Sequence, residues 1–351
     1  MTPLADTAEP GGQRPGLWAW ALLAPLLLWL FLLVIVPTAI MVAFSFCKRD
    51  ALGQVVFEFT TENYARIADV QQAKGLLISA AVGLSAAAGV WGVRRRVGLS
   101  GSTWPMLTLL GLFWVTLNIC VLLSGGEVDA ARWLKITVVS INYAAAATAV
   151  CVALGYPVAY FIGRSPERWR NLLLMAVMVP FWTSFLVRTY AWVTILRRNG
   201  VLESLLSWTH LHDGPLDLYP SQTGVMIGLI YTYLPFMILP IYASVERLDN
   251  ALVEAALDLG ASPMRAFRGV VLPLTKPGII AGVVLVFVPA VGMFAVNDIL
   301  GGRQEMLIGN VIERQFTAAR DKPFGSAMGM VLLMLFIATY ALSMRRRSAA
   351  S

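Results

Sequence analysis

Long apolar stretches alternate along this chain with short polar ones, and the apolar stretches are mostly of membrane-spanning length. A helix needs about 20 apolar residues to cross the hydrocarbon core of a bilayer. The pattern predicts eight such helices, at residues 17–45, 75–93, 104–124, 135–163, 171–196, 223–245, 277–299 and 324–344. The first stretch is longer than the core of a cleaved signal peptide, about 7 to 15 residues. We therefore expect an all-α polytopic membrane protein that keeps its first span.

Composition supports this fold class. Of the 351 residues, 58% are hydrophobic and 13% are charged, whereas a soluble domain has about 45 to 50% apolar and about 25% charged residues. The formal net charge of +7 includes basic clusters beside apolar spans, at Arg94–Arg96 and Arg345–Arg347. Such clusters mark the cytoplasmic side of a membrane protein. We expect cytoplasmic N- and C-termini and no nucleic-acid partner.

Cysteine usage gives no sign of a metal site. Three cysteines, Cys47, Cys120 and Cys151, form an odd set without metal-ligand spacing. We interpret them as packing residues.

One charged segment between two apolar spans, "EAALDLGASPMRAFRGVVLPLTKPG" at 254–278, has a helical pattern of its own. Asp249 or Asn250 can cap its first helix. Four small or apolar residues recur on one face of that helix: Leu252, Ala255, Ala256 and Leu259. Gly260 suits a left-handed helix stop, and Ser262–Pro263 suits a restart. The pattern predicts two short helices and a tight turn, and a loop that merely connects two spans is the alternative.

The spacing of this hairpin resembles the EAA loop of permease subunits in binding-protein-dependent ABC importers. Gly260 follows the Glu-Ala-Ala motif after three residues, and Leu272–Pro273 follows later, with Val270 where isoleucine is more usual. In that family the loop is the coupling helix that docks into a cytoplasmic ATPase subunit. The resemblance implies this role for a cytoplasmic hairpin at 249–273. The residues it assigns to coupling are Glu254, Ala255, Ala256, Leu259, Gly260, Arg265, Phe267, Leu272 and Pro273.

Other segments look like the spermidine/putrescine branch of this family. They are "VPFWTSFLVRTYAW" (179–192), "YTYLPFMILPIYASVERLD" (231–249), "MLIGNVIERQF" (306–316) and "RDKPFGSAMGM" (320–330). The similarity fails between about 68 and 131. The resemblance implies a type I ABC importer permease fold, with a six-helix core and a two-helix insertion. Residues 1–67 are then the cytoplasmic tail, first span and outside segment, 68–131 the insertion, and 132–351 the permease core.

The resemblance also implies a function and its partners. It implies a multi-pass subunit of the bacterial inner membrane that moves polyamines into the cell. The expected partners are a second permease subunit, a dimer of ATPase subunits, a periplasmic or extracellular substrate-binding protein, and membrane lipid. The chain has no P-loop, nucleophile elbow or His/carboxylate cluster. We therefore expect no catalysis and no bound cofactor or metal in this chain, with ATP and magnesium on the partner ATPase.

Alternative functions remain open at this stage. The first is an importer of the same architecture for another small solute, such as an amino-acid derivative, an opine or an oxyanion. The second is an ATPase-independent channel or secondary transporter, which does not explain the hairpin. An intramembrane enzyme would need paired acids, histidines or metal ligands at one membrane depth, and the sequence shows none.

Candidate residues of a substrate path are charged or aromatic side chains in or near the predicted spans. They are Asp298, Trp182, Tyr190, Trp192, Tyr231, Tyr233 and Arg188. Asp298 is the one acid within a predicted span, and it can contact an ammonium group or cap a helix. The aromatic rings can bind alkylammonium groups by cation–π contacts or simply belong to the interfacial aromatic belt.

Arg188 lies well inside a predicted span. An isolated cation there costs about 2.5 to 3.5 kcal/mol on insertion scales. We expect Arg188 either to form a structural or gating ion pair or to line the outer mouth of the path.

Overall fold

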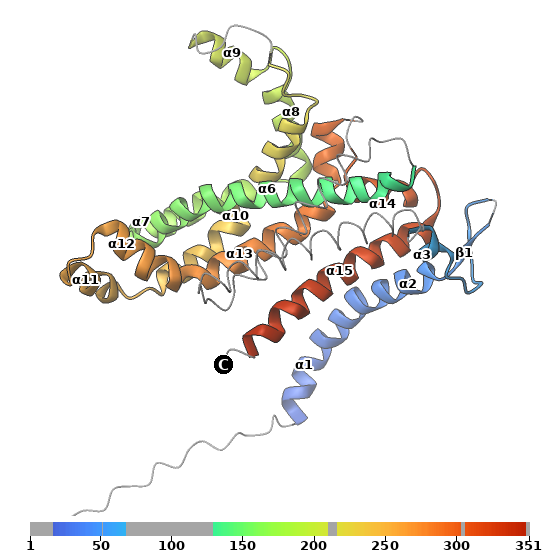
Figure 1. Ribbon diagram of the computed structural model, residues 1–351, viewed down its shortest axis with the longest axis horizontal. Coiled ribbons are helices and arrows are strands. Elements are labelled where there is room, and N and C mark those ends of the chain that lie inside the picture. The colour runs from blue at the N-terminus through green and yellow to red at the C-terminus, as the bar shows by residue number, and fades with distance from the viewer. Residues whose placement is uncertain (1–16, 51, 68–128, 210–215, 303–305, 349–351) are drawn as a thin grey trace, which may run out of the picture. The chain divides into compact units, whose positions relative to one another are not determined.

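The computed structural model describes residues 17–50, 52–67, 129–209, 216–302 and 306–348, and most of them are helical. The predicted spans at 75–93 and 104–124 lie outside the described residues, as do Arg94–Arg96 and Cys120. The chain divides into two compact units, Met1–Ile67 with Gln315–Ser351 and Ala68–Arg314 (Figure 1). Each unit is described by itself below.

The first unit contains the first and last predicted spans. The first is an unbroken helical run of α1 (Leu17–Leu30), η1 (Phe31–Ile35) and α2 (Val36–Ser45). The last is α15 (Lys322–Ser348), which packs along α2. The helical bounds of both predictions, 17–45 and 324–344, are confirmed to within a few residues, and Leu23–Ser45 is also long and apolar enough to cross a membrane.

Two π-helical segments each precede a proline in a long helix. Proline has no N–H, and its ring collides with the carbonyl of residue i−4 in a regular α-helix. The segments η1 and η2 (Phe267–Val271) each end just before a proline, Pro37 and Pro273. In each segment the widened turn closes on the carbonyl of its first phenylalanine. One wide turn therefore lets the helix continue through the proline.

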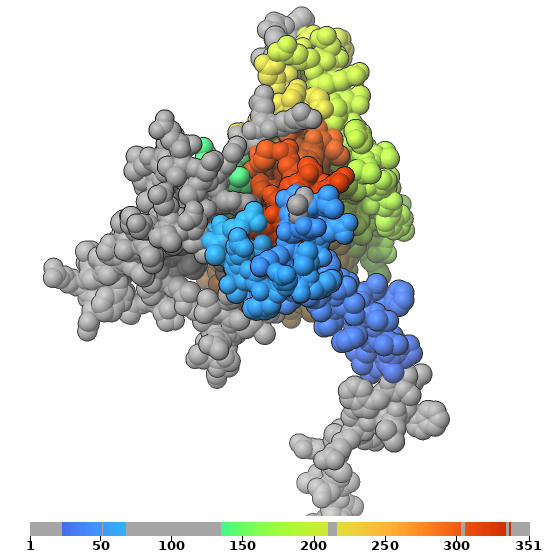
Figure 2. Space-filling model, turned by 90° about the vertical axis from the view of Figure 1, so that its right-hand side faces the viewer, coloured from blue at the N-terminus to red at the C-terminus, as the bar shows by residue number. Residues whose placement is uncertain are grey.

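A small cap follows α2 in the first unit. It consists of the antiparallel pair β1 (Lys48–Arg49) and β2 (Val55–Val56), followed by α3 (Glu62–Ile67). These residues form the light blue surface in Figure 2. The buried Asn63 donates from Nδ2 to the carbonyl oxygens of Ser45 at 3.0 Å and Cys47 at 2.8 Å. The amide thereby ties α3 to the end of α2.

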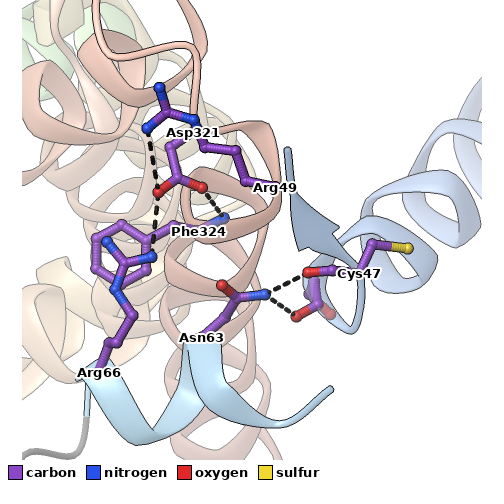
Figure 3. A network of polar contacts seen from close by, with 7 residues as sticks. Cys47, Arg49, Asn63, Arg66, Asp321 and Phe324 are labelled. Carbon is purple, nitrogen blue, oxygen red and sulfur yellow. Dashed lines mark hydrogen bonds and ion pairs between the residues drawn. The ribbon is translucent and has the colours of Figure 1, made fainter. Parts of the chain in front are cut away.

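Asp321 connects the cap to the start of α15. Its carboxylate is 6% exposed and lies 3.1 Å from Nη1 of Arg66 and 3.9 Å from Nη1 of Arg49 (Figure 3). Its other oxygen accepts the backbone N–H of Phe324 at 3.1 Å. The guanidinium of Arg66 also lies 4.0 Å from the ring centroid of Phe324. A buried carboxylate is stable only when it is paired in this way.

Three helices form the core of the second unit: α6 (Asp129–Arg164), α10 (Gln222–Glu246) and α13 (Leu272–Gly292). Small residues allow the helices to approach closely, as is typical of membrane bundles. At Gly282 of α13, for example, a Cβ atom would lie 2.6 Å from Sδ of Met237 on α10. The buried Cys151 of α6 and Cys47 of the first unit are free thiols, which agrees with their prediction as packing residues.

The predicted span at 171–196 is wrong in shape. It is broken into α7 (Glu167–Trp182) and α8 (Phe185–Leu196), and the chain bends there by 91° before continuing to α9 (Val201–Trp208) (Figure 1). Thr183 and Ser184 adopt extended backbone at the bend. The hydroxyl of Thr183 donates to the carbonyl of Pro180 at 2.7 Å. That carbonyl would otherwise accept the next helical N–H, so a local side-chain bond competes with the helix.

The predicted span at 277–299 is also displaced. The helix begins earlier, at α12 (Pro263–Ala266), runs through η2 into α13, and ends at Gly292 because Met293 is extended. A separate turn, η3 (Asn297–Gly301), follows, and then α14 (Ile308–Phe316). Within the described residues, four helices are long and apolar enough to cross a membrane, or five if the bent pair is one span.

Candidate functional site

The charged hairpin begins with a capped helix, α11 (Asn250–Asp258). The carboxylate of Asp249 accepts the backbone N–H of Ala251 at 2.9 Å. This contact satisfies one of the free N–H groups at a helix start. The prediction of a cap at Asp249 or Asn250 is confirmed, with Asp249 as the capping residue.

The same helix ends as its sequence predicts. Gly260 has a φ of +86°, a conformation that favours glycine. Its N–H donates to the carbonyl of Leu257 at 2.9 Å, and the N–H of Ala261 donates to Ala256 at 3.1 Å. This pair of bonds is a Schellman stop.

The second half of the hairpin differs from the prediction. Ser262 occupies the N-cap position without a side-chain cap bond, and Pro263 opens α12. There is no separate short second helix among these residues, because α12 continues through η2 into α13. The hairpin is therefore built directly on the end of a core helix.

The hairpin exposes apolar surface that nothing in the described chain covers. Leu259 is 90% exposed, Met264 58% and Leu252 49%. The other predicted coupling residues are mostly exposed as well, namely Glu254, Ala255, Gly260, Arg265, Leu272 and Pro273, while Ala256 is half-buried. Small and apolar residues beside a carboxylate suit the close approach of another protein.

Phe267 fixes the root of the hairpin to the core. Its ring meets Tyr156 and Tyr160 of α6 edge to face, with centroids 5.7 and 6.1 Å apart. The hydroxyl of Tyr156 shares a 3.0 Å hydrogen bond with Oγ1 of the buried Thr275 on α13. These contacts attach the root of the hairpin to α6 and α13. Tyr156, Tyr160 and Thr275 could not be predicted from the sequence, because no local pattern joins residues so far apart.

A second cluster surrounds Arg188. Its guanidinium carbon lies 5.1 Å from the ring centroid of Phe181 on α7 and 5.9 Å from that of Tyr231 on α10. Trp192 meets Tyr231 edge to face at 5.5 Å, and Phe236 meets Phe181 in the same way at 5.1 Å. We call Phe181, Tyr231, Trp192 and Phe236 the aromatic cradle. Three of the predicted path residues, Arg188, Trp192 and Tyr231, thus lie together.

The other predicted aromatic residues play different parts. Tyr233 is only 5% exposed, and its ring packs against Phe236. Trp182 and Tyr190 are 73% and 59% exposed. Phe181 and Phe236 were not among the predicted path residues, although each directly follows a proline inside a predicted span.

The ion pair expected as one option for Arg188 is not formed with any described residue. No described carboxylate oxygen lies within 4.0 Å of its side-chain nitrogens. Its Nε is buried without a hydrogen-bond partner. The aromatic rings are the groups that surround this cation.

Asp298 lies in η3, beyond the end of α13 rather than inside a span. Its Oδ1 accepts from Nδ2 of Asn310 at 2.6 Å. Asn310 is buried and its own Oδ1 accepts from Nδ2 of Asn297 at 2.8 Å. The carboxylate of Asp298 is thus oriented but still exposed. The segment η3 packs against α8 and α10, the helices that carry Arg188 and Tyr231.

The described residues offer no grouping of three His, Cys, Asp or Glu side chains that could hold a metal ion. What they offer is an aromatic cluster around the Arg188 guanidinium, an oriented carboxylate and an exposed hairpin rooted in the core. Binding and transmitted motion are the chemistry that this set supports.

The chain is similar in sequence to a family of known transport proteins. Residues 155–348 match the family described as "Binding-protein-dependent transport system inner membrane component". The chain is 36% identical over 323 residues to the spermidine/putrescine transport system permease protein PotB of Salmonella typhimurium, covering 90% of this chain and 91% of that protein. It is 35% identical over 323 residues to PotB of Escherichia coli, covering 90% and 95%.

A crystal structure of a bacterial ABC transporter that imports the acidic polysaccharide alginate is also similar. It shares 17% identity with a TM-score of 0.44, covering 74% of this chain and 98% of that chain.

Proposed function

The chain belongs to the inner membrane components of binding-protein-dependent transport systems, and we propose that it is the permease subunit of an ATP-driven ABC importer for polyamines such as spermidine and putrescine. The observation that carries this proposal is the identity to PotB proteins over nine tenths of the chain. Membership in the family makes the chain an all-α, multi-pass protein of the inner membrane with the permease fold.

The exposed hairpin supports the proposed partners. In this account α11 docks into a groove of a cytoplasmic ATPase subunit, with Glu254 facing basic groups of that subunit. ATP and magnesium bind to the ATPase dimer, and this chain performs no catalysis. Both termini and the hairpin are cytoplasmic, and a substrate-binding protein delivers polyamine from the outside.

The root of the hairpin supports a route for the motion. When the ATPase subunits close, they displace the hairpin, and Phe267 transmits this displacement to Tyr156 and Tyr160 of α6. The same segment continues into α13. A second permease subunit supplies the other wall of the path, so that the two subunits alternately open to the outside and the inside.

The substrate path itself is proposed to pass Asp298 and the aromatic cradle. Asp298 supplies the negative charge among the predicted path residues, and aromatic faces attract alkylammonium groups. One carboxylate discriminates weakly among multiply charged cations, so most selectivity is assigned to the binding protein or the partner permease.

Purification of the tagged chain from its native membrane tests the proposal. We expect an ATPase and a second permease to copurify, and ATP hydrolysis to rise when a binding protein loaded with spermidine or putrescine is added. A chain that purifies without an ATPase, but still transports, would identify a channel or secondary transporter. Stimulation only by an amino-acid derivative, an opine or an oxyanion would retain the importer and reject the polyamine substrate.

A further inference from the structure

We propose that Arg188 is a built-in competitor of the transported polyamine, because its guanidinium occupies the aromatic cradle that receives a substrate ammonium group during transport. This inference rests on the polyamine function proposed above. It assigns the cradle as a cation subsite and Arg188 as the residue that controls access to it.

The cradle has the geometry of a cation site. Its members come from α7, α8 and α10. The two rings nearest the guanidinium lie 5.1 and 5.9 Å from it, within the range of about 6 Å for cation–π attraction. Trp192 and Phe236 touch these rings at angles of 68° and 87°, edge to face. Edge-to-face neighbours hold ring planes in fixed orientations, so the faces stay available to a cation.

Arg188 is held in the cradle by exchangeable contacts. An arginine that only stabilises a fold is best locked by a bidentate carboxylate, which fixes its position. No described carboxylate reaches Arg188, and its buried Nε has no hydrogen-bond partner. Another cation can replace the guanidinium on the rings without breaking an ion pair in the described chain.

The bend between α7 and α8 allows Arg188 to move out of the aromatic cradle. Arg188 lies in the first turn of α8, where its backbone N–H donates to the backbone carbonyl oxygen of Ser184 at 3.1 Å. The extended residues Thr183 and Ser184 separate this turn from α7 at the 91° bend. A rotation of α8 about the bend moves Arg188 and, on the same helix, Trp192. Phe181 on α7 and Tyr231 and Phe236 on α10 keep their places as the part of the cradle that receives the substrate cation.

Occupancy by Arg188 and by substrate is mutually exclusive. Two like charges on the same ring faces repel strongly in a partly dry site. The cradle therefore holds Arg188 in the resting subunit and a substrate ammonium only after α8 has moved. This exchange keeps polyamine from leaking through the resting importer.

Direct binding to the resting importer tests the proposal. The complete complex is placed in nanodiscs without ATP, and the binding of radiolabelled spermidine is measured by equilibrium dialysis. Arg188→Gln removes the charge and keeps a long polar side chain, and we expect spermidine to bind at least about tenfold more tightly, as removal of a close like charge predicts. Arg188→Lys keeps the charge and should bind spermidine as weakly as wild type. Adding Tyr231→Leu to Arg188→Gln should abolish the gain.

Unchanged or weaker binding by Arg188→Gln, in a complex that assembles normally, would overturn the proposal and make Arg188 structural. If Arg188→Gln does not assemble, the double variant Phe181→Leu/Tyr231→Leu decides, with Arg188 intact. We expect its spermidine uptake to fall several-fold, and unchanged uptake would reject the cradle as a subsite. Phe161→Leu, at an exposed ring of α6 outside the cradle, is the matched control. Absence of polyamine uptake by the wild-type complex would instead refute the proposed function.

Discussion

Asn310 donates a 2.6 Å hydrogen bond from Nδ2 to Oδ1 of Asp298, so a buried amide orients the one acid among the predicted path residues. The contact joins α14 to η3, just beyond the end of α13. An asparagine at 298 could still accept this bond through its amide oxygen. The substitution Asp298→Asn therefore removes the charge of the side chain and keeps its hydrogen bond to Asn310.

Asp298→Asn should lower spermidine and putrescine uptake by about tenfold or more while leaving assembly unchanged. A partly desolvated charged hydrogen bond contributes about 1.5 to 3 kcal/mol, whereas an exposed ion pair contributes about 0 to 1. Because Asp298 is exposed in this subunit, the larger value requires the second permease to close over it. Asp217→Asn is the control, since Asp217 is 74% exposed and pairs with Arg198. Normal uptake of both polyamines by Asp298→Asn would remove this residue from the path.

Phe267→Ala should disconnect the hairpin from α6. The ring is the contact through which the hairpin root meets Tyr156 and Tyr160. We expect the ATPase to remain bound, but its hydrolysis should no longer respond to loaded binding protein. Phe267→Leu, which keeps most of the apolar volume, should retain part of the response. Phe161→Ala, at an exposed ring of α6, should retain all of it. A full response in Phe267→Ala would show that motion passes by another route.

The cap network of the first unit makes a prediction about stability. Asp321→Ala should destabilise the subunit by about 1 to 3 kcal/mol, because a buried N–H and two arginines lose their partner. Asp321→Asn should cost less, since its amide oxygen can still accept the N–H of Phe324. Glu58→Gln, in an exposed pair with Lys48, should change little. Thermal unfolding in detergent measures all three, and equal melting temperatures for Asp321→Ala and wild type would contradict the assignment.

Opposite sides of the membrane are predicted for the hairpin and α9. In a background with Cys120 replaced, Ser262→Cys should be protected from an impermeant maleimide in intact cells, and Ser207→Cys should be labelled. The native Cys47 and Cys151 are buried, so the maleimide should not label them. Labelling of Ser262→Cys from the outside would invert the proposed topology.

Two changes in the hairpin test its docking. Glu254→Lys reverses the charge offered to the ATPase. Gly260→Trp places a bulky side chain at a position with a φ of +86°, which disfavours any residue other than glycine. Both variants should stay in the membrane but lose ATP hydrolysis stimulated by loaded binding protein. Normal stimulation in both would reject the hairpin as the coupling element.

Local features of the sequence predicted local structure well. The lengths of the apolar stretches located the first and last predicted helices. Asp249 and Gly260 marked the two ends of α11, because an aspartate can accept a free N–H at a helix start and glycine tolerates a positive φ at a helix end. Hydropathy could not reveal the break at Thr183–Ser184, because both residues lie within an apolar stretch. The break depends on a hydroxyl that bonds the carbonyl of Pro180.

Contacts between distant residues were beyond the sequence patterns. For Arg188 the sequence predicts either an ion pair or a place at the outer mouth of the path, and it does not indicate the rings of Phe181 and Tyr231 on two other helices. The Tyr156–Thr275 bond joins residues 119 positions apart. Helical periodicity gives the face on which a side chain lies, but it does not give the neighbouring helix.

Uptake by reconstituted vesicles is the most direct test of the account. The purified complex is placed in proteoliposomes with ATP and magnesium inside and loaded binding protein outside, and radiolabelled spermidine is counted over time. We predict accumulation that stops when ATP is omitted and when the complex carries Gly260→Trp. Accumulation that is independent of ATP, or no polyamine accumulation by an active complex that imports another solute, would contradict the account.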